Sequence, residues 1–206
     1  MLGKFITLEG TEGAGKSTAL RFVADYLQQK GKKVHVTREP GGTPLAEQIR
    51  ELLLHPASSE KWAAETELLL MFAARAQHIA ACILPALQQG VWVVSDRYVD
   101  ASYAYQGAGR GMDRSLIATL DQLIVKDCRP DLTLLLDLPA DMGILRAAKR
   151  GSAQDRIEQE ALDFFVRVRE AYLLRAKAEP TRMKVIDASR AITKVEQQIR
   201  DILDSF

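Results

Sequence analysis

The sequence has 206 residues, enough for one domain with a sizeable core, and an ordinary composition with 47% hydrophobic and 27% charged residues. A net charge of +1 gives no global field that would attract nucleic acid or an anionic membrane. Any recognition of an anion must therefore be local. Few apolar residues precede Glu9, and we expect no signal peptide, no membrane span and a cytoplasmic location.

Neither the cysteines nor the histidines show the spacing of a metal site. Cys82 and Cys128 form no C-x-x-C pair, and Cys82 lies in an apolar helical run typical of a packed thiol. His35, His55 and His78 are scattered along the chain, so we interpret each of them as structural rather than as a zinc ligand.

Five short apolar runs alternate with helical stretches, and near-continuous Val, Ile and Leu suits strands that are covered on both faces. We therefore predict an α/β fold of three layers, in which a five-stranded parallel sheet lies between helices. The strands are expected over Phe5–Leu8, Val34–Thr37, Val91–Ser95, Leu132–Leu138 and Val185–Asp187. The helices are expected over Ser17–Gln29, Leu45–Leu54, Ala63–Gln89, Ser115–Lys126, Ala140–Ala148, Gln159–Lys177 and Thr193–Asp204. No repeat or linker divides residues 1–206, which predicts a single domain.

The strongest motif follows the first strand. Residues Gly10 to Ser17 read Gly-Thr-Glu-Gly-Ala-Gly-Lys-Ser and fit the phosphate-binding loop G-x-x-x-x-G-K-[ST]. Its glycines let inward-facing backbone N–H groups approach an anion, Lys16 would reach the β and γ phosphates of a nucleotide, and Ser17 would hold Mg²⁺. A strand before it and a helix after it supply the required context, so the motif predicts a P-loop NTPase fold.

Ligands of open α/β sheets bind beyond the carboxyl ends of the strands, so the residues that follow each strand are candidates. Arg38 and Glu39 follow the second strand, before Pro-Gly-Gly, although a solvated turn with a surface ion pair would look the same. Asp96 and Arg97 follow the third strand. An Asp there can orient Mg²⁺ or its waters, and the adjacent Arg can bind a phosphate through two N–H groups.

Two later segments are candidates for recognising the rest of a ligand. Arg75 lies in the apolar run of the long helix, one turn from Met71 and Phe72, where it could bind a nucleobase or extend to water. Ala101–Gly111 is rich in hydroxyl, amide and glycine, as expected for a loop that contacts a base and sugar or for a plain loop.

A cationic stretch interrupts the helical pattern near the C-terminal third. Between Arg146 and Glu158, small and polar residues separate several cations, which favours a mobile lid over about residues 146–157 that would bring arginines onto transferring phosphates. An exposed basic loop is the alternative.

Taken together, these motifs resemble the bacterial thymidylate kinase (dTMP kinase) family. The resemblance runs from about Lys4 to the C-terminus and rests on Leu-Glu9-Gly-x-Glu12-Gly-Ala-Gly-Lys-Ser, Thr-Arg-Glu-Pro-Gly-Gly, Phe-Ala-Ala-Arg, Asp-Arg-Tyr, Ala-Tyr-Gln-Gly and Arg-Gly…Asp-Arg-Ile-Glu. It implies transfer of the γ-phosphoryl of ATP to dTMP with Mg²⁺, which gives dTDP and ADP and supplies dTTP for DNA synthesis. It also implies a homodimer formed through long helices that include Ala63–Gln89.

The resemblance also implies roles for individual residues. The ATP-binding residues are Gly10, Thr11, Glu12, Gly13, Ala14, Gly15, Lys16, Ser17 and Thr18. The dTMP-binding residues are Arg38, Glu39, Arg50, Met71, Phe72, Arg75, Arg97, Ser102, Tyr105 and Gln106. The catalytic residues are Lys16, Arg97, Glu12 and the lid arginines Arg150 and Arg156, and the metal ligands are Ser17 and Asp96. The family usually has an aromatic residue four positions before the helix Arg, where this chain has Met71 followed by Phe72, so either could contact thymine.

Two other functions remain open on the residues alone. A kinase for a different acceptor, such as thymidine or shikimate, would share the P-loop and the lid, although a nucleoside kinase would be expected to carry Asp/Glu-Arg-Ser after the third strand. A regulatory GTPase or ATP-driven switch is disfavoured, because the chain has neither Asn-Lys-x-Asp nor an Asp-x-x-Gly after the third strand.

Overall fold

The computed structural model describes residues 2–56, 60–149 and 155–206, and it places five parallel strands in one sheet of order β2-β3-β1-β4-β5. The strands are β1 (Phe5–Glu9), β2 (Val34–Arg38), β3 (Trp92–Asp96), β4 (Leu132–Asp137) and β5 (Met183–Asp187). The helices are α1 (Lys16–Gln29), α2 (Pro44–Leu54), α3 (Ala64–His78), η1 (Ile79–Ile83), α4 (Leu84–Gln88), α5 (Val99–Ser102), η2 (Tyr103–Gly109), α6 (Arg114–Ile124), α7 (Ala140–Ala148), α8 (Leu162–Ala178) and α9 (Ile192–Asp204). The predicted fold class is confirmed.

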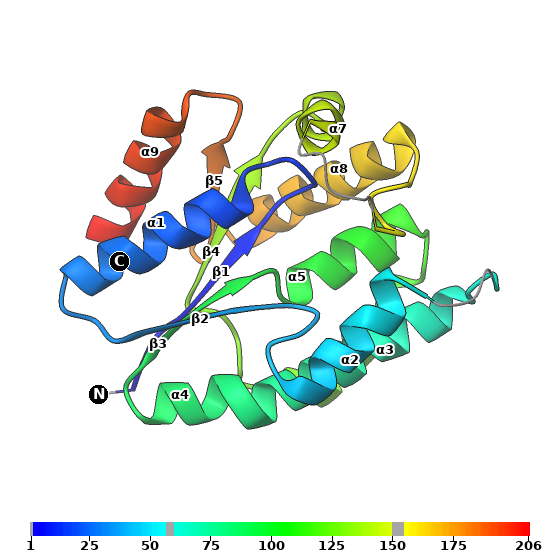
Figure 1. Cartoon of the computed structure of the whole chain (residues 1–206), viewed down its shortest axis with the longest axis horizontal. Coiled ribbons are helices and arrows are strands. Elements are labelled where there is room, and N and C mark those ends of the chain that lie inside the picture. The colour runs from blue at the N-terminus through cyan, green and yellow to red at the C-terminus, as the bar shows by residue number, and fades with distance from the viewer. Residues whose placement is uncertain (1, 57–59, 150–154) are drawn as a thin grey trace.

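Helices cover both faces of the sheet (Figure 1). On one face, Ile6 and Leu8 of β1 belong to a buried cluster with side chains of α1 and α9. Because side chains alternate along a strand, Phe5, Thr7 and Glu9 face the other side, where α3, α4, α6 and α8 lie. There the buried hydroxyls of Thr7 and Thr133 hydrogen-bond each other at 2.7 Å. Glu9, also buried on this face, contacts Tyr172 of α8.

The register of the central strands brings two predicted motifs together. Leu8 of β1 pairs with Asp96 of β3, and the backbone N–H of Arg97 donates to the carbonyl of Leu8 at 2.9 Å. The P-loop, which continues from β1, therefore lies beside the Asp-Arg pair at the carboxyl edge of the sheet.

Most predicted boundaries are within one or two residues of the observed ones, but two segments differ in kind. The long helix predicted over residues 63–89 contains a π-helical stretch, η1, between α3 and α4. The segment Ala101–Gly111, predicted as a loop, is mostly helical, because α5 continues into the π-helix η2. The glycines there allow close packing: a Cβ on Gly109 would lie 2.6 Å from the ring of Phe164 on α8.

We expected no run of the sequence to approach a membrane span. The helical stretch Ala64–Gln88 is nevertheless long enough and apolar enough to cross a membrane, judged by length and composition alone. In the structure, α3 packs against α2 and α6. It also buries Glu67, Arg75 and His78, as suits an internal helix of a globular fold.

Candidate active site

The P-loop connects β1 to α1 through a backbone path that depends on glycine. Gly13 and Gly15 have φ angles of 71° and 90°, in the left-handed region that glycine adopts most readily. A Cβ on Gly13 would lie only 2.1 Å from the carbonyl oxygen of Gly143 on α7, so the loop and this helix are in close backbone contact.

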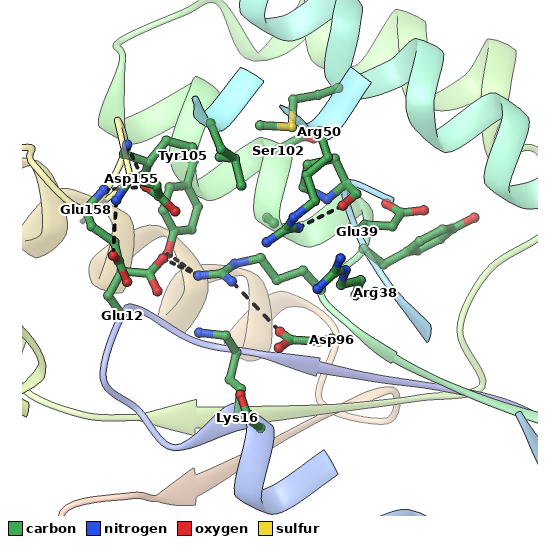
Figure 2. Close-up of a pocket in the computed structure, with 18 of the residues that line it drawn as sticks. Glu12, Lys16, Arg38, Glu39, Arg50, Asp96, Ser102, Tyr105, Asp155 and Glu158 are labelled. Atoms are coloured by element: carbon green, nitrogen blue, oxygen red, sulfur yellow. Dashed lines mark hydrogen bonds and ion pairs between the residues drawn. The ribbon is translucent and has the colours of Figure 1, made fainter. Parts of the chain in front are cut away.

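Lys16, the first residue of α1, folds back over the loop. Its Nζ donates to the carbonyls of Gly10 at 3.1 Å and Thr11 at 2.9 Å. Burial and the nearby charge of Arg97 lower the pKa of Lys16. Lys16 also lines the cavity, with Asp96 drawn beside it in Figure 2, and an anionic phosphate bound there would compensate the charge of the amine.

Arg97 lies between the P-loop and η2. It has a φ of 69° and therefore adopts the left-handed conformation without being glycine. Its guanidinium donates to Glu12 and, at 2.9 Å, to the hydroxyl of Tyr105. Burial would lower the pKa of Arg97, but the charge of Glu12 raises it, so the side chain is a permanent cation. A fixed cation next to the P-loop is suited to binding two phosphates at once.

A buried carboxyl holds this unusual backbone in place. Glu9 accepts from the backbone N–H of Tyr98 at 2.8 Å and from the hydroxyl of Tyr172 on α8 at 2.6 Å. Burial and the charge of Asp100 raise the pKa of Glu9 to about 8. Glu9 was noted only as part of a motif, and nothing in the sequence pattern singled out Tyr172, which lies 163 positions away.

Two further arginines make one wall of the cavity electropositive. Arg38 pairs with Glu47 at 2.9 Å, and Arg50 donates to the carbonyl of Pro40 at 2.8 Å. Burial, followed by the positive charges of Arg38 and Arg97, lowers the pKa of Arg50. Three arginines that repel one another around a common space are suited to binding an anion.

The other end of the cavity is built around Arg75, which makes one protein hydrogen bond from each of its three guanidinium nitrogens. It donates to Glu39 at 2.8 Å, to Ser102 at 3.0 Å and to the carbonyl of Tyr98 at 3.1 Å. Nearby, the amide nitrogen of Gln106 donates to Glu67 at 2.8 Å. Because a carboxylate only accepts, that contact assigns the amide and makes the Gln106 carbonyl oxygen its acceptor atom for a ligand.

The sequence left open whether Met71 or Phe72 contacts the base, and the structure places these two residues in different surroundings. Met71 lines the cavity. Phe72 is buried instead among Phe5, Val93 and Tyr98, with the guanidinium carbon of Arg75 4.7 Å from its ring centroid. Met71 is therefore the residue positioned to contact a bound base.

Of the two predicted lid arginines, Arg156 does not line the cavity. Arg150 lies outside the described residues. Arg156 donates to Glu67 at 2.6 Å and to the carbonyl of Leu53 at 3.0 Å, and it stacks on Trp62. Its predicted catalytic role stays a prediction.

All these elements surround one cavity of about 490 Å³. Figure 2 shows Glu12, Asp155 and Glu158 on one side of it, and Arg38, Arg50 and Glu39 on the other. The predicted site residues that line it are Glu12, Gly13, Gly15, Lys16, Ser17, Thr18, Arg38, Glu39, Arg50, Met71, Arg75, Asp96, Arg97, Ser102, Tyr105 and Gln106. Sequence reasoning missed Leu54 as part of this wall, and it named Asp155, Ile157 and Glu158 only within the lid motif, without a site role of their own.

A second cavity of about 240 Å³ adjoins the P-loop between α1 and α9, and it shares Gly15, Thr18 and Arg146 with the first cavity. Ala14, which was predicted to bind ATP, lines this second cavity. Its remaining wall is largely apolar and comes from β4, the end of β5 and α9, including Leu136, Ala188, Ile192, Val195 and Ile199.

The predicted metal ligands fit a hard cation. Ser17 and Asp96 both line the first cavity, and Oδ1 of Asp96 is a buried oxygen with no hydrogen-bond partner among the described residues. That atom lies 3.8 Å from a nitrogen of Arg97. The part of the chain that the structure describes has no cluster of three His, Cys, Asp or Glu suited to a metal. Mg²⁺ needs no such cluster, since it commonly takes one or two protein oxygens together with substrate phosphates.

Comparison with known proteins agrees with this geometry. A family model described as thymidylate kinase matches residues 8–199. The chain belongs to the thymidylate kinase family. A thymidylate kinase of Alcanivorax borkumensis is 55% identical over 100% of this chain and 98% of the relative. One of Chromohalobacter salexigens is 57% identical over 96% of this chain and 93% of the relative.

The structural comparison points the same way. A crystal structure of thymidylate kinase from Ehrlichia chaffeensis superposes with a TM-score of 0.79 at 34% identity and covers 99% of each chain. Thymidylate kinases phosphorylate dTMP with ATP, and this enzyme accordingly converts ATP and dTMP into ADP and dTDP. The functional prediction from the sequence is thereby confirmed.

Proposed function

We propose that this dTMP kinase holds the two phosphates that react between the P-loop and Arg97, and the thymine ring at Arg75. One observation carries the proposal: a single cavity contains Lys16 and Ser17 at one end, Arg97 in the middle, and Arg75 with Gln106 at the other. The order matches that of a bound pair of substrates, with the ATP phosphates first, the dTMP phosphate next and the base last.

In this arrangement the protein would catalyse the reaction by aligning the two substrates and neutralising their negative charge, without transferring a proton. A phosphate monoester is already largely ionised at pH 7, so the acceptor oxygen needs no general base. Lys16 and the P-loop amides would bind the donor phosphates, and Arg97 would contact donor and acceptor groups together. Arg38 and Arg50 would hold the acceptor phosphate. Such alignment and neutralisation of charge make up most of the catalysis of phosphoryl transfer.

Ser17 and Asp96 would hold Mg²⁺, either directly or through its waters. When bound, the ion supplies charge neutralisation between the donor phosphates. The orphaned oxygen of Asp96 supports this assignment. The second cavity would take the base of ATP, because it adjoins the P-loop on the side away from Arg97 and has an apolar wall.

Tyr105 would exclude a ribose. Its hydroxyl is fixed between Arg97 and Glu12, and its ring packs edge-on against Phe164 and Tyr172 at centroid distances of 6.0 and 6.3 Å. Because these contacts hold the Tyr105 ring in place, the ring could not move aside to make room for a 2′-hydroxyl. The base end would read thymine through donors of Arg75 and the acceptor oxygen of Gln106, with Met71 against the ring.

Other features of the enzyme are inferred from its family resemblance and composition. We infer a single domain over residues 1–206 and a cytoplasmic enzyme that binds neither nucleic acid nor membrane. The lid predicted over about residues 146–157 lies partly outside the described residues. We also infer a homodimer that uses the outer face of the long helical stretch, where Leu69 and Leu84 are exposed.

A panel of acceptors tests the proposed site. We would measure ADP release with Mg-ATP and dTMP, dUMP, ribothymidine 5′-monophosphate, AMP or thymidine, against a blank without acceptor. We expect dUMP to be roughly 10- to 200-fold poorer in kcat/KM, since a missing methyl group is worth about 1–3 kcal/mol. Ribothymidine monophosphate should be poor if Tyr105 excludes a 2′-hydroxyl, and equal rates with it and dTMP would contradict this role. Transfer to thymidine would contradict the phosphate site at Arg38 and Arg50.

A further inference from the structure

The side chain that fixes the base end of the cavity is itself held by a second, fully buried group. Glu39 uses one carboxylate oxygen to accept from Arg75 at 2.8 Å and the other to accept from Nδ1 of His78 at 2.9 Å. The opposite ring nitrogen of His78 lies 2.7 Å from the hydroxyl of Thr37. A continuous path of polar contacts therefore runs from β2 through His78 and Glu39 to Arg75.

The local structure holds His78 in this position. Arg75 and His78 are three residues apart on α3, so their side chains share one face of the helix and reach the same carboxylate. The loop that carries Glu39 closes over the ring at Gly42, whose φ is 83° and where a Cβ would lie 2.4 Å from Nε2 of His78. Only glycine permits so close an approach there.

The charges explain why the ring stays in place. His78 is 0% exposed, and Glu39 and Arg75 are 4% and 3% exposed, so none of these groups can exchange its partner for bulk water. Burial would lower the pKa of His78, but its contacts with Cys82 and Glu39 raise it to about 9. One carboxylate thus lies between two cations, and each cation limits how far the carboxylate can move toward the other.

We propose that His78 is a positioning residue for thymine recognition: by holding Glu39 it fixes the guanidinium of Arg75 at the base end of the acceptor cavity. The inference rests on the proposed placement of thymine at Arg75. Histidine is not required for the chemistry itself, because His78 does not line the cavity among the described residues. Its effect should therefore be confined to the binding and selection of dTMP.

Two substitutions separate positioning from simple filling of the core. The amide of Asn branches from Cγ, as Nδ1 of histidine does, so His78→Asn can still donate to Glu39. The amide of Gln branches one carbon later, at the level of Nε2, so His78→Gln can keep the contact with Thr37 but leaves Glu39 without its donor. Both variants place a neutral amide in the same buried space.

We expect His78→Gln to raise KM for dTMP about tenfold or more, since hydrogen bonds to charged groups are the strong ones. KM for ATP should be unchanged and kcat should stay within a few-fold. His78→Asn should remain within about twofold of the parent enzyme for dTMP. The preference for dTMP over dCMP should narrow in His78→Gln alone, because dCMP presents a donor where thymine presents a carbonyl oxygen.

Steady-state kinetics with both substrates, together with thermal unfolding of each variant, decides the question. Equal KM values for dTMP in the two variants, or a parallel rise in KM for ATP, would overturn the inference. An Arg75→Ala variant identifies which step fails. If it leaves KM for dTMP unchanged, the proposed placement of thymine is wrong, and the inference is wrong with it. If it raises KM while His78→Gln does not, only the role of His78 is overturned.

Discussion

Removing the guanidinium of Arg97 should separate catalysis from folding. In phosphoryl-transfer enzymes an arginine at the transferred group contributes about 10³- to 10⁵-fold in turnover. At about 1.4 kcal/mol for each factor of ten, the loss of transition-state stabilisation is about 4–7 kcal/mol. The cost to the fold should be far smaller, because the partner left behind, Glu12, lines an open cavity where water can solvate it. Arg97→Ala should therefore fold normally and be nearly inactive.

The backbone of Arg97 supplies a matched control. Its φ of 69° costs a residue with a Cβ about 1–2 kcal/mol, a cost that glycine does not bear. Arg97→Gly should thus be as inactive as Arg97→Ala but more stable by about 1 kcal/mol, which corresponds to about 2–4 °C in Tm for a chain of this length. ADP release with dTMP and thermal unfolding provide the two readouts. Turnover within tenfold of the parent enzyme in either variant, or a lower Tm for the glycine variant, would refute the reasoning.

Two further predictions follow from the backbone and from a buried acid. Gly13→Ala should abolish ATP binding, because the added Cβ would lie 2.1 Å from the carbonyl oxygen of Gly143. Gly31 also has a positive φ but has open space around it, so the control Gly31→Ala should lose stability and keep activity. Steady-state kinetics and thermal unfolding of both variants test this prediction. The pKa of Glu9 is raised from 4.5 to about 8, so the folded state retains a proton that the unfolded state loses. Stability should therefore fall as pH rises through that window, and Glu9→Gln should flatten this part of the denaturation profile; an unchanged slope would argue against it.

The fold was predictable because the central strands β1, β3 and β4 are covered on both faces, which makes them visible as near-continuous apolar runs such as Leu132–Leu136, interrupted only by Thr133. The phosphate end of the site was predictable for a related reason. Its residues are contiguous in sequence or follow strand ends directly, so the rule for parallel sheets places the P-loop beside Asp96 and Arg97.

What the sequence did not predict depends on packing between distant segments. The glycines of Ala101–Gly111 were interpreted as loop formers, whereas Gly109 lets η2 pack closely against Phe164 of α8. The contacts of Tyr172 with Glu9 and of His78 with Glu39 join segments 163 and 39 residues apart, and no local pattern marks them. The choice between Met71 and Phe72 also required the helix rotation, which only the packing of α3 fixes.

The hydrogen bond from the N–H of Arg97 to the carbonyl of Leu8 fixes the position of Arg97 relative to β1. It ties the start of the P-loop and the Asp-Arg pair to adjacent parallel strands, whose separation is fixed at about 4.8 Å. Backbone geometry therefore fixes how far the P-loop lies from Asp96 and Arg97. We expect a diphosphate acceptor, which is one phosphoryl group longer, to fit poorly between phosphate-binding residues held at this spacing. We therefore expect the reaction to terminate itself, with dTDP leaving as a finished product instead of being extended.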